Sequence, residues 1–300
     1  MKNEHYSVLL NESLEALNLK VDGTYVDLTL GMGGHSSHIL KQIPKGRLIS
    51  FDKDPFAIEE SRKRLSQIGN NFHLVHADFA NIAAELEKMG ITSVDGIVAD
   101  LGISSPQIDN PERGFSYNKE ARLDMRMDTT QDLDAYYIVN NYSETELSQI
   151  FYNNAEVKFA KQVAKAIVNN RPIVTTIQLA NIVRNSLPAK IVNLKNPNKA
   201  IFQAIRIEVN KELDSLKKML TDAVQLLKVG ASLAVISFHS LEDGIVKKFF
   251  GELTKDKLPS KMPINEEKFY SVKVVKVSKS ELEANNRSRS AKLRILTKIK

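Results

Sequence analysis

Acidic and glycine residues follow several apolar stretches at positions where they could bind a nucleoside. Gly31, Gly33 and Gly34 follow the first stretch, and glycines there let the backbone approach a ligand closely. Asp52 lies 21 residues after Gly31, where a carboxylate can accept both hydroxyls of a ribose. Asp100 follows a later apolar stretch in the same way. This spacing predicts a ligand that contains adenosine.

The glycine pattern favours S-adenosylmethionine over a dinucleotide. The dinucleotide fingerprint G-x-G-x-x-G would need glycine at position 36, where this chain has Ser36. Asp78 and Phe79 follow a third apolar stretch and suit the edge and face of an adenine. Two alternatives stay open on these residues. One is a nicotinamide-dependent dehydrogenase, and the other is that Asp52 and Asp78 only cap the helices that follow them.

The elements that would position these residues alternate between strand and helix over the first hundred residues. Expected strands cover residues 24–30, 47–51, 72–76 and 93–99, and expected helices cover residues 35–42, 57–68 and 81–89. Alternation at this spacing predicts a doubly wound α/β fold with a mostly parallel sheet and helices on both faces. The carboxyl ends of parallel strands share one edge of a sheet, so the acids and glycines would meet there.

The alternating pattern stops after residue 106. Helical stretches follow, without an intervening strand, at residues 132–140, 144–152, 156–169, 176–186 and 199–227. A buried strand returns at residues 232–237, and the stretches 270–277 and 293–299 alternate like a late strand pair at the sheet edge. We therefore expect a ligand-binding core of residues 1–106 and 210–300, interrupted by a mainly helical insert of residues 107–209.

Charge is unevenly distributed along the 300 residues. Residues 1–154 hold 14 Lys or Arg against 23 Asp or Glu, whereas residues 155–211 hold 10 against 2 and the last thirty hold 9 against 2. Two basic blocks predict a polyanionic partner, although two solvated faces would look the same. The chain begins without a secretory signal and its apolar runs are too short to cross a bilayer, so we expect a soluble cytoplasmic protein.

Longer motifs give a specific resemblance. In order, they are HYSVLLNE, DLTLGMGGHS, DKDP, DLGISSPQ, ERGFSY with LDMRMD, FQAIRIEVNKEL, ISFHSLED and NNRSRSAKLRI. The chain resembles the bacterial 16S ribosomal RNA cytosine-N4 methyltransferase family, which modifies cytosine 1402 of the small ribosomal subunit. The resemblance implies S-adenosylmethionine as the methyl donor, a Rossmann-like class I methyltransferase core, and a helical insert that helps to hold RNA.

The resemblance also assigns site residues. Cofactor binding falls on Gly33, Gly34, His35, Asp52, Phe79, Asp100 and Gln107. The resemblance alone assigns His35 and Gln107. The spacing of the sequence independently predicts most of the other cofactor contacts. No metal site is expected, because the chain lacks cysteine and its histidine pairs have no evident third ligand.

The implied chemistry is methyl transfer to an amine whose lone pair is delocalised into the cytosine ring. Such an amine needs hydrogen-bond acceptors on its N–H groups, for which the candidates are Asp100, the turn carbonyls at 101–104, Ser104 and Ser105. His239 follows the last parallel strand and either contacts the target or serves as a structural histidine. Methylation at cytosine C5 would usually need a cysteine nucleophile, which this chain does not have.

The basic blocks supply candidate contacts to 16S ribosomal RNA. They are Lys158, Lys161, Lys165, Arg171 and Arg184 in the insert and Arg287, Arg289, Lys292 and Arg294 in the tail. The insert is alternatively expected to form a homodimer through an apolar helical face. A further alternative for the whole chain is a non-catalytic RNA-binding module on an old cofactor fold, against which the complete GMGGH and SSPQ motifs argue.

Overall fold

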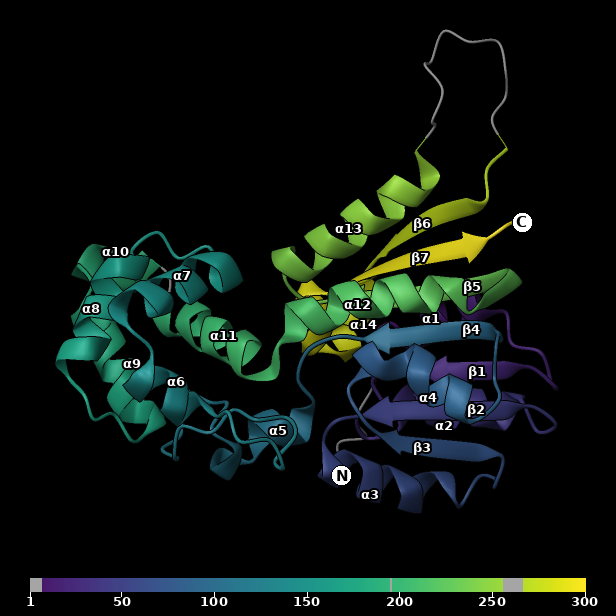
Figure 1. Cartoon of the computed structure of the whole chain (residues 1–300), viewed down its shortest axis with the longest axis horizontal. Coiled ribbons are helices and arrows are strands. Elements are labelled where there is room, and N and C mark those ends of the chain that lie inside the picture. The colour runs from purple at the N-terminus through teal and green to yellow at the C-terminus, as the bar shows by residue number, and fades with distance from the viewer. Residues whose placement is uncertain (1–6, 195, 256–266) are drawn as a thin grey trace, which may run out of the picture. The chain divides into compact units, whose positions relative to one another are not determined.

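The chain forms two compact units. The computed structural model describes residues 7–194, 196–255 and 267–300, apart from the side chains of residues 284, 286 and 287. The first unit runs up to Gly102 and resumes at Asp214, and the second covers Ile103–Leu213 (Figure 1). The second unit therefore interrupts the first in sequence.

A seven-stranded sheet organises the first unit, in the order β3-β2-β1-β4-β5-β7-β6. The strands are β1 (Thr24–Asp27), β2 (Arg47–Asp52), β3 (Phe72–His76), β4 (Val94–Asp100), β5 (Leu227–Ser237), β6 (Tyr270–Lys276) and β7 (Lys292–Lys298). Strands β1 to β5 pair in parallel, whereas β7 runs antiparallel between β5 and β6. The predicted α/β fold, with a mostly parallel sheet and a late strand pair at its edge, is confirmed.

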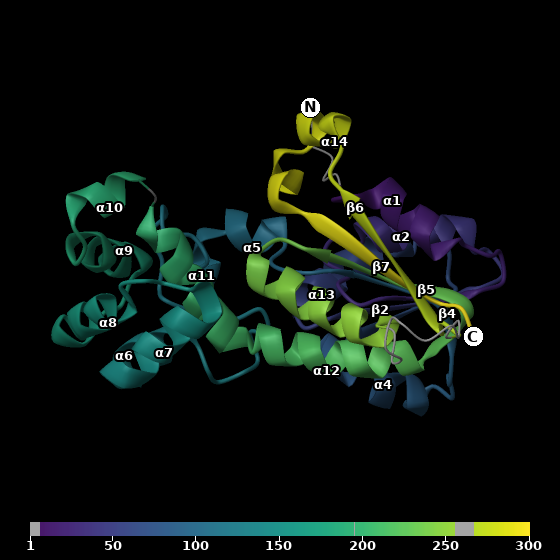
Figure 2. The same cartoon turned by 90° about the horizontal axis from the view of Figure 1, so that it is seen from above.

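Helices cover both faces of this sheet, as the alternating pattern predicted. They are α4 (Ile82–Lys88), α12 (Glu212–Gln225) and α13 (Ser240–Thr254) on one face and α1 (Leu10–Leu17), α2 (Gly34–Gln42) and α3 (Pro55–Leu65) on the other. Neighbouring side chains of a strand point to opposite faces, so Tyr25 joins one apolar cluster and Val26 the other. Figure 2 shows α12 and α13 on one side of the sheet and α1 and α2 on the other.

Three of the parallel strands end on an acidic residue. Asp27 ends β1, Asp52 ends β2 and Asp100 ends β4. Strand β1 pairs with both β2 and β4, so the three carboxyl groups come from adjacent strands of one sheet. The sheet thus gathers acids where open α/β sheets bind their ligands.

Short helices around one apolar cluster make up the second unit. They are α5 (Ser105–Asp109), α6 (Ala135–Asn141), α7 (Glu144–Ala155), α8 (Ala160–Asn169), α9 (Thr176–Asn185), α10 (Ala189–Leu194) and α11 (Pro197–Asn210). Side-chain oxygens begin several of them, for example Ser143, which accepts the backbone N–H of Glu146 at the start of α7. The remaining helix, α14 (Lys279–Ala284), belongs to the first unit.

One expected helix is in fact two. Residues 199–227 were expected to form a continuous helix, but α11 ends and α12 begins on either side of Lys211. Lys211 adopts a left-handed conformation with φ 52°, and Arg206 holds the turn by pairing with Glu212 at 2.8 Å. The expectation was wrong because a lysine in this conformation leaves no glycine or proline signal in the sequence.

Candidate active site at the carboxyl ends of the parallel strands

The loop after β1 needs glycine at three positions. Gly31 (φ 49°) and Gly33 (φ 72°) adopt the left-handed region of backbone conformation. A Cβ atom on Gly33 would lie 3.1 Å from Ser61 Oγ, and one on Gly34 would lie 1.8 Å from Ser7 Oγ. Gly31 is therefore required by its backbone conformation, Gly34 by the lack of space, and Gly33 by both, and the loop leads directly into α2.

Ser36 stands where a dinucleotide site would have its third glycine, and it has a structural task of its own. Its hydroxyl donates to Asp27 Oδ2 at 2.6 Å and lies 2.8 Å from Ser50 Oγ. Asp27, Ser36 and Ser50 are all buried. Sequence reasoning missed Asp27, although an aspartate inside an otherwise apolar strand was a visible signal. Ser36 thus compensates a buried carboxyl group that no glycine could serve.

Asp52 contacts the glycine loop. Its Oδ2 accepts the backbone N–H of Gly31 at 2.8 Å, and its Oδ1 accepts that of Asp54 at 2.9 Å. Burial raises the pKa of Asp52 to about 6, with a further rise from Asp54 and Asp27, despite the two backbone hydrogen bonds that lower it. Asp54, which accepts the N–H of Phe56, caps α3 instead. The capping alternative is therefore wrong for Asp52.

The capping alternative holds for Asp78. Its Oδ1 accepts the N–H of Ala80 at 2.8 Å, and its Oδ2 is engaged by Lys53 at 2.7 Å and by Ser215 Oγ at 2.9 Å. Phe79, the next residue, is half-buried and packs against the apolar cluster on the α12 face. Phe79 keeps part of its ring accessible after β3, while Asp78 is fully engaged in the fold.

Asp100 is held by its backbone and leaves a carboxyl oxygen without a partner. Its N–H donates to Thr29 Oγ1 at 2.6 Å, while its buried Oδ1 has no hydrogen-bond partner within the residues described. Burial raises the pKa of Asp100 well above its usual range, and the nearby Asp27 and Glu242 raise it further. A buried acceptor without a partner and with a raised pKa is typical of functional sites, which keeps Asp100 as a candidate.

His239 begins α13 and faces Glu242. Its Nδ1 accepts the Glu242 N–H at 3.4 Å, and its Nε2 lies 3.1 Å from Glu242 Oε1. Glu242 is buried, and its other oxygen accepts the N–H of Phe238 at 2.9 Å. The His239 ring therefore takes part in the helix cap, as the structural alternative expected, and it contacts one of the acids that raise the pKa of Asp100.

His35 lies at the start of α2 and is buried against the N-terminal segment. It hydrogen-bonds the backbone of Val8, and its Nε2 has no partner within the described part of the chain. Burial lowers the pKa of His35, which outweighs the opposite effect of Asp27, so the ring is neutral at pH 7. Ser7 and Val8 thus cover the first turn of α2.

A contact with the C-terminal region holds this N-terminal segment in place. Glu281 Oε1, on α14, accepts the backbone N–H of Leu9 at 3.3 Å and the hydroxyl of Ser288 at 2.5 Å. Leu9 is fully buried and has a φ of 49°, a conformation that leucine rarely adopts. We call this set of contacts, Leu9 with Glu281 and Ser288, the terminal clasp. Nothing in the sequence spacing signalled it.

Ser104, Ser105 and Gln107 belong to the second unit. Ser104 precedes α5, Ser105 begins it, and both side chains are half-buried. Gln107 is buried, and its side-chain oxygen accepts the N–H of Ser104 at 2.9 Å. These three residues follow Asp100 directly in the chain, through the turn at Gly102 (φ 102°).

The basic residues of the insert fall into two groups. Lys158, Lys161, Lys165 and Arg184 are exposed. Arg171 is half-buried, and its guanidinium donates to the carbonyl of Val139 at 2.8 Å and to that of Tyr142. Arg171 therefore joins α6 to the segment after α8, whereas the other four present their charges to solvent.

The tail divides in the same way. Arg289 is exposed, and the side chain of Arg287 lies outside the described residues. Lys292 and Arg294 pair with Asp243 at 2.6 and 2.7 Å. Burial raises the pKa of Asp243, but the two cations outweigh it and lower the pKa below its usual value. These two side chains connect β7 to α13, and Arg294 is almost fully buried.

The described residues contain neither a candidate metal site nor a candidate membrane span. No group of three or more His, Asp or Glu side chains there is placed to share a metal ion. No helix in the described ranges combines the length and apolarity needed to cross a membrane.

Comparisons with known proteins give consistent matches along the whole chain. The model of the MraW methylase family matches residues 2–299. A ribosomal RNA small subunit methyltransferase H of Mycoplasmopsis agalactiae is 65% identical over 299 residues, 100% of each chain, and that of Mycoplasmopsis synoviae is 60% identical over 300 residues, also 100% of each. Among solved structures, a putative methyltransferase from Streptococcus mutans in complex with SAH has a TM-score of 0.49 and 12% identity over 98% of this chain and 99% of that one.

The terminal clasp generates a prediction about stability. Glu281→Ala removes the acceptor of a buried N–H and a buried hydroxyl, so we expect a loss of ~1–3 kcal/mol in the free energy of unfolding, measured by urea denaturation. Glu281→Gln keeps one oxygen and should lose less. Glu283→Ala, at an exposed position of the same helix, serves as the control, with a change below about 0.5 kcal/mol. Equal stabilities of the two alanine variants would contradict the role of the clasp.

Proposed function

The chain belongs to the MraW methylase family, and on that premise we propose that it methylates the exocyclic N4 amine of cytosine 1402 in 16S ribosomal RNA, with S-adenosylmethionine as donor. The relatives named as ribosomal RNA small subunit methyltransferases support the RNA substrate. Within the chain, the proposal rests most on Asp100, a buried acceptor without a partner in the described residues, at the strand ends beside the glycine loop.

The residues at the strand ends fit this donor. Asp52 uses one lone pair of each oxygen for a backbone N–H, which leaves acceptor capacity for the two ribose hydroxyls. Asp27, Asp52 and Asp100 pair with no Lys or Arg in the described part of the chain, so the site favours a cationic ligand such as a sulfonium. Ser36, committed to Asp27, does not provide the close approach that a pyrophosphate requires.

When bound, the donor supplies an electrophilic methyl group: the bond from N4 to this carbon forms as the carbon–sulfur bond breaks, and sulfur keeps that electron pair. The protein supplies alignment and an acceptor. Asp100 Oδ1 accepts an N–H of the target amine and so turns the nitrogen lone pair toward the methyl carbon. The raised pKa of Asp100 makes its carboxylate a stronger base, suited to hold the proton that N4 loses in the net reaction.

The other candidate residues keep the roles that the sequence predicts for them. Ser104, Ser105 and the carbonyls of the turn after β4 are the further acceptors for the amine. His35, Gly33, Gly34, Phe79 and Gln107 remain candidates for the donor site. His239 remains a candidate for a contact to the target, because its buried Nε2, 3.1 Å from Glu242 Oε1, has no hydrogen-bond partner within the described residues.

The structure narrows which basic side chains are free to contact RNA. We propose phosphate contacts for the exposed Lys158, Lys161, Lys165, Arg184 and Arg289. Arg171, Lys292 and Arg294 are engaged inside the fold and have less capacity for phosphates.

The proposed function is tested by mapping the modified nucleotide. Small ribosomal subunits that lack the modification are incubated with the protein and isotopically labelled donor, and the RNA is digested and analysed by mass spectrometry. We expect one label per 16S molecule, on the N4 atom of cytosine 1402. A label at cytosine C5, on another nucleotide, or on no nucleotide would overturn the proposal.

Asp100→Ala tests the role of the acceptor in the same reaction. Without general-base and orienting help, kcat should fall about 10²- to 10⁴-fold. The fold should persist, because the substitution relieves repulsion with Asp27 and Glu242. Thermal unfolding shows whether the variant is folded, and calorimetry measures its donor binding separately, because Asp100 is itself a candidate donor contact. A variant that binds donor normally and keeps full turnover would refute the assignment.

Asp52 predicts a pH dependence of donor binding. Its pKa of about 6 means that the carboxylate is ionised at pH 7.5 and protonated at pH 5, which removes ribose acceptors. The affinity for S-adenosylhomocysteine should be constant above pH 7 and fall about tenfold per pH unit well below the pKa. Asp52→Asn should bind weakly at pH 7.5 and lack this dependence. An affinity that stays constant from pH 7.5 to 5 would exclude the proposed contact.

Salt dependence tests the phosphate contacts. Each contact should contribute ~0.7–0.9 to the slope of log affinity against log salt concentration. Lys165→Gln should therefore lower the slope for a 16S fragment by about that amount. Lys217→Gln, on α12 outside the two basic blocks, is the control and should leave the slope unchanged. Identical slopes for wild type and Lys165→Gln would remove Lys165 from the interface.

A further inference from the structure

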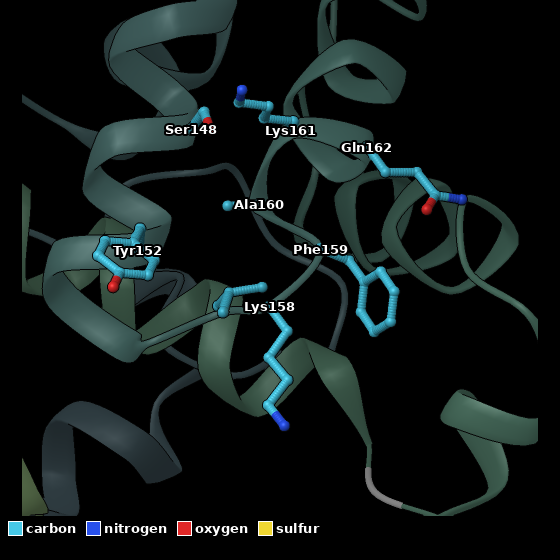
Figure 3. A pocket seen from close by; sticks show the side chains of 8 residues that line it. Ser148, Tyr152, Lys158, Phe159, Ala160, Lys161 and Gln162 are labelled. Carbon is cyan, nitrogen blue, oxygen red and sulfur yellow. The ribbon is translucent and has the colours of Figure 1, made fainter.

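A cavity in the second unit lies apart in sequence from every residue of the strand-end site. Its volume is about 370 Å³, and it opens between the last turns of α7 and the first turn of α8. Figure 3 shows Tyr152 and Ser148 on the α7 side and Ala160 on the α8 side. Ligand sites start at about 300 Å³, so the cavity has room for one small group and not for a folded partner.

An exposed aromatic ring forms one wall. Tyr152 is 66% exposed, compared with 53% for Tyr137, the other exposed tyrosine among the described residues. Two ring pairs lie elsewhere in the unit, Tyr117 with Phe202 and Tyr137 with Tyr142, whereas no ring contact to Tyr152 is found in the described residues. In Figure 3 Phe159 points away from Tyr152. Tyr152 therefore offers an aromatic surface that the fold itself does not use.

Two cations flank this wall. Lys158 and Lys161 line the cavity, and Figure 3 shows them leaving it in opposite directions. Neither lysine has an acidic or hydrogen-bonding partner within the described ranges, and no Asp or Glu lines the cavity. The first turn of α8 adds to the positive potential, because its N-cap residue, Phe159, carries no side-chain acceptor.

An aromatic face between two separated cations matches one repeat of a single-stranded nucleic acid. Such a strand alternates bases, which stack on aromatic rings, with phosphates, which seek lysine. A duplex presents no free base face, so the matching ligand is an unpaired nucleotide. The carboxylates of an acidic peptide would pair with the two lysines, but they would not stack on the Tyr152 ring.

We propose that this cavity binds one unpaired nucleotide of the RNA substrate, with its base stacked on Tyr152 and its flanking phosphates on Lys158 and Lys161. This inference rests on the proposed function, because the RNA is the substrate of the proposed methylation. The cavity would be a second RNA-binding site, in addition to the strand-end site. Every base has a stacking face, so the site accepts any of the four bases and selects for single-stranded character.

The test measures binding of the full-length protein to a fluorescently labelled single-stranded RNA octamer, by anisotropy. Tyr152→Ala should weaken binding about 5- to 100-fold, while Tyr152→Phe, which keeps a ring, should stay within about twofold of wild type. The salt slope should be unchanged in both tyrosine variants and shallower by ~0.7 in Lys158→Gln and in Lys161→Gln. Tyr137→Ala, exposed on α6, is the matched control and should bind as wild type does.

Other outcomes overturn the proposal. Wild-type affinity in Tyr152→Ala would remove the stacking site, and equal competition by a polyglutamate peptide would identify a carboxylate-binding surface instead. A duplex of the same length that binds as tightly through Tyr152 would exclude selection for unpaired bases.

Methyl transfer in parallel separates this proposal from the proposed function. If wild type methylates the small subunit while Tyr152→Ala leaves both KM and octamer binding unchanged, only the cavity assignment fails. If wild type does not methylate it but the octamer still binds through Tyr152, the proposed reaction fails and the nucleotide site stands. S-adenosylhomocysteine affinity should be the same in all variants, and an unchanged thermal unfolding transition verifies that the second unit is folded.

Discussion

Three carboxyl groups at the ends of β1, β2 and β4, none paired with Lys or Arg within the described residues, are the constraint around which the first unit is built. Burying carboxyl groups without cations is costly, and the raised pKa values of Asp52 and Asp100 are the direct sign of that cost. The fold offsets it with neutral donors: the Ser36 hydroxyl serves Asp27, and the backbone of Gly31 serves Asp52. The glycine loop thus has two roles: its backbone can approach a ligand, and Gly31 donates an N–H to Asp52.

Much of this arrangement could be predicted from local sequence, because its signals are local. Apolar runs bounded by glycine and acid marked the strands to within a few residues, and Asp52 and Asp100 were identified from their position after a strand. What Asp52 and Asp78 each do could not be predicted, because both follow a strand and precede a helix. Asp54 takes the cap of α3, which leaves Asp52 to the loop, whereas Asp78 caps its own turn. The break at Lys211 was missed because it depends on a pairing between side chains rather than on a residue type that breaks helices.

The distribution of charge along the sequence identifies the two basic blocks. It does not show which basic side chains within each block are exposed and which are bound inside the fold. Arg171, Lys292 and Arg294 looked identical to Lys165 in the sequence. Arg171 donates to two backbone carbonyls about thirty residues away along the chain. Lys292 and Arg294 both pair with Asp243, about fifty residues away. Long-range partners of this kind decide whether a cation is a structural tie or a surface charge, and only the folded chain reveals them.

The terminal clasp determines when the N-terminal segment can become ordered during synthesis of the chain. The segment over α2 is held by residues near the other end of the chain, and β7 enters the sheet between β5 and β6 although it is the last strand to be synthesised. Because a chain is synthesised from its N-terminus, the segment over α2 stays without this support until residues 281 and 288 have been added. Chains released before Glu281 and Ser288 have been added lack the contacts that hold Leu9.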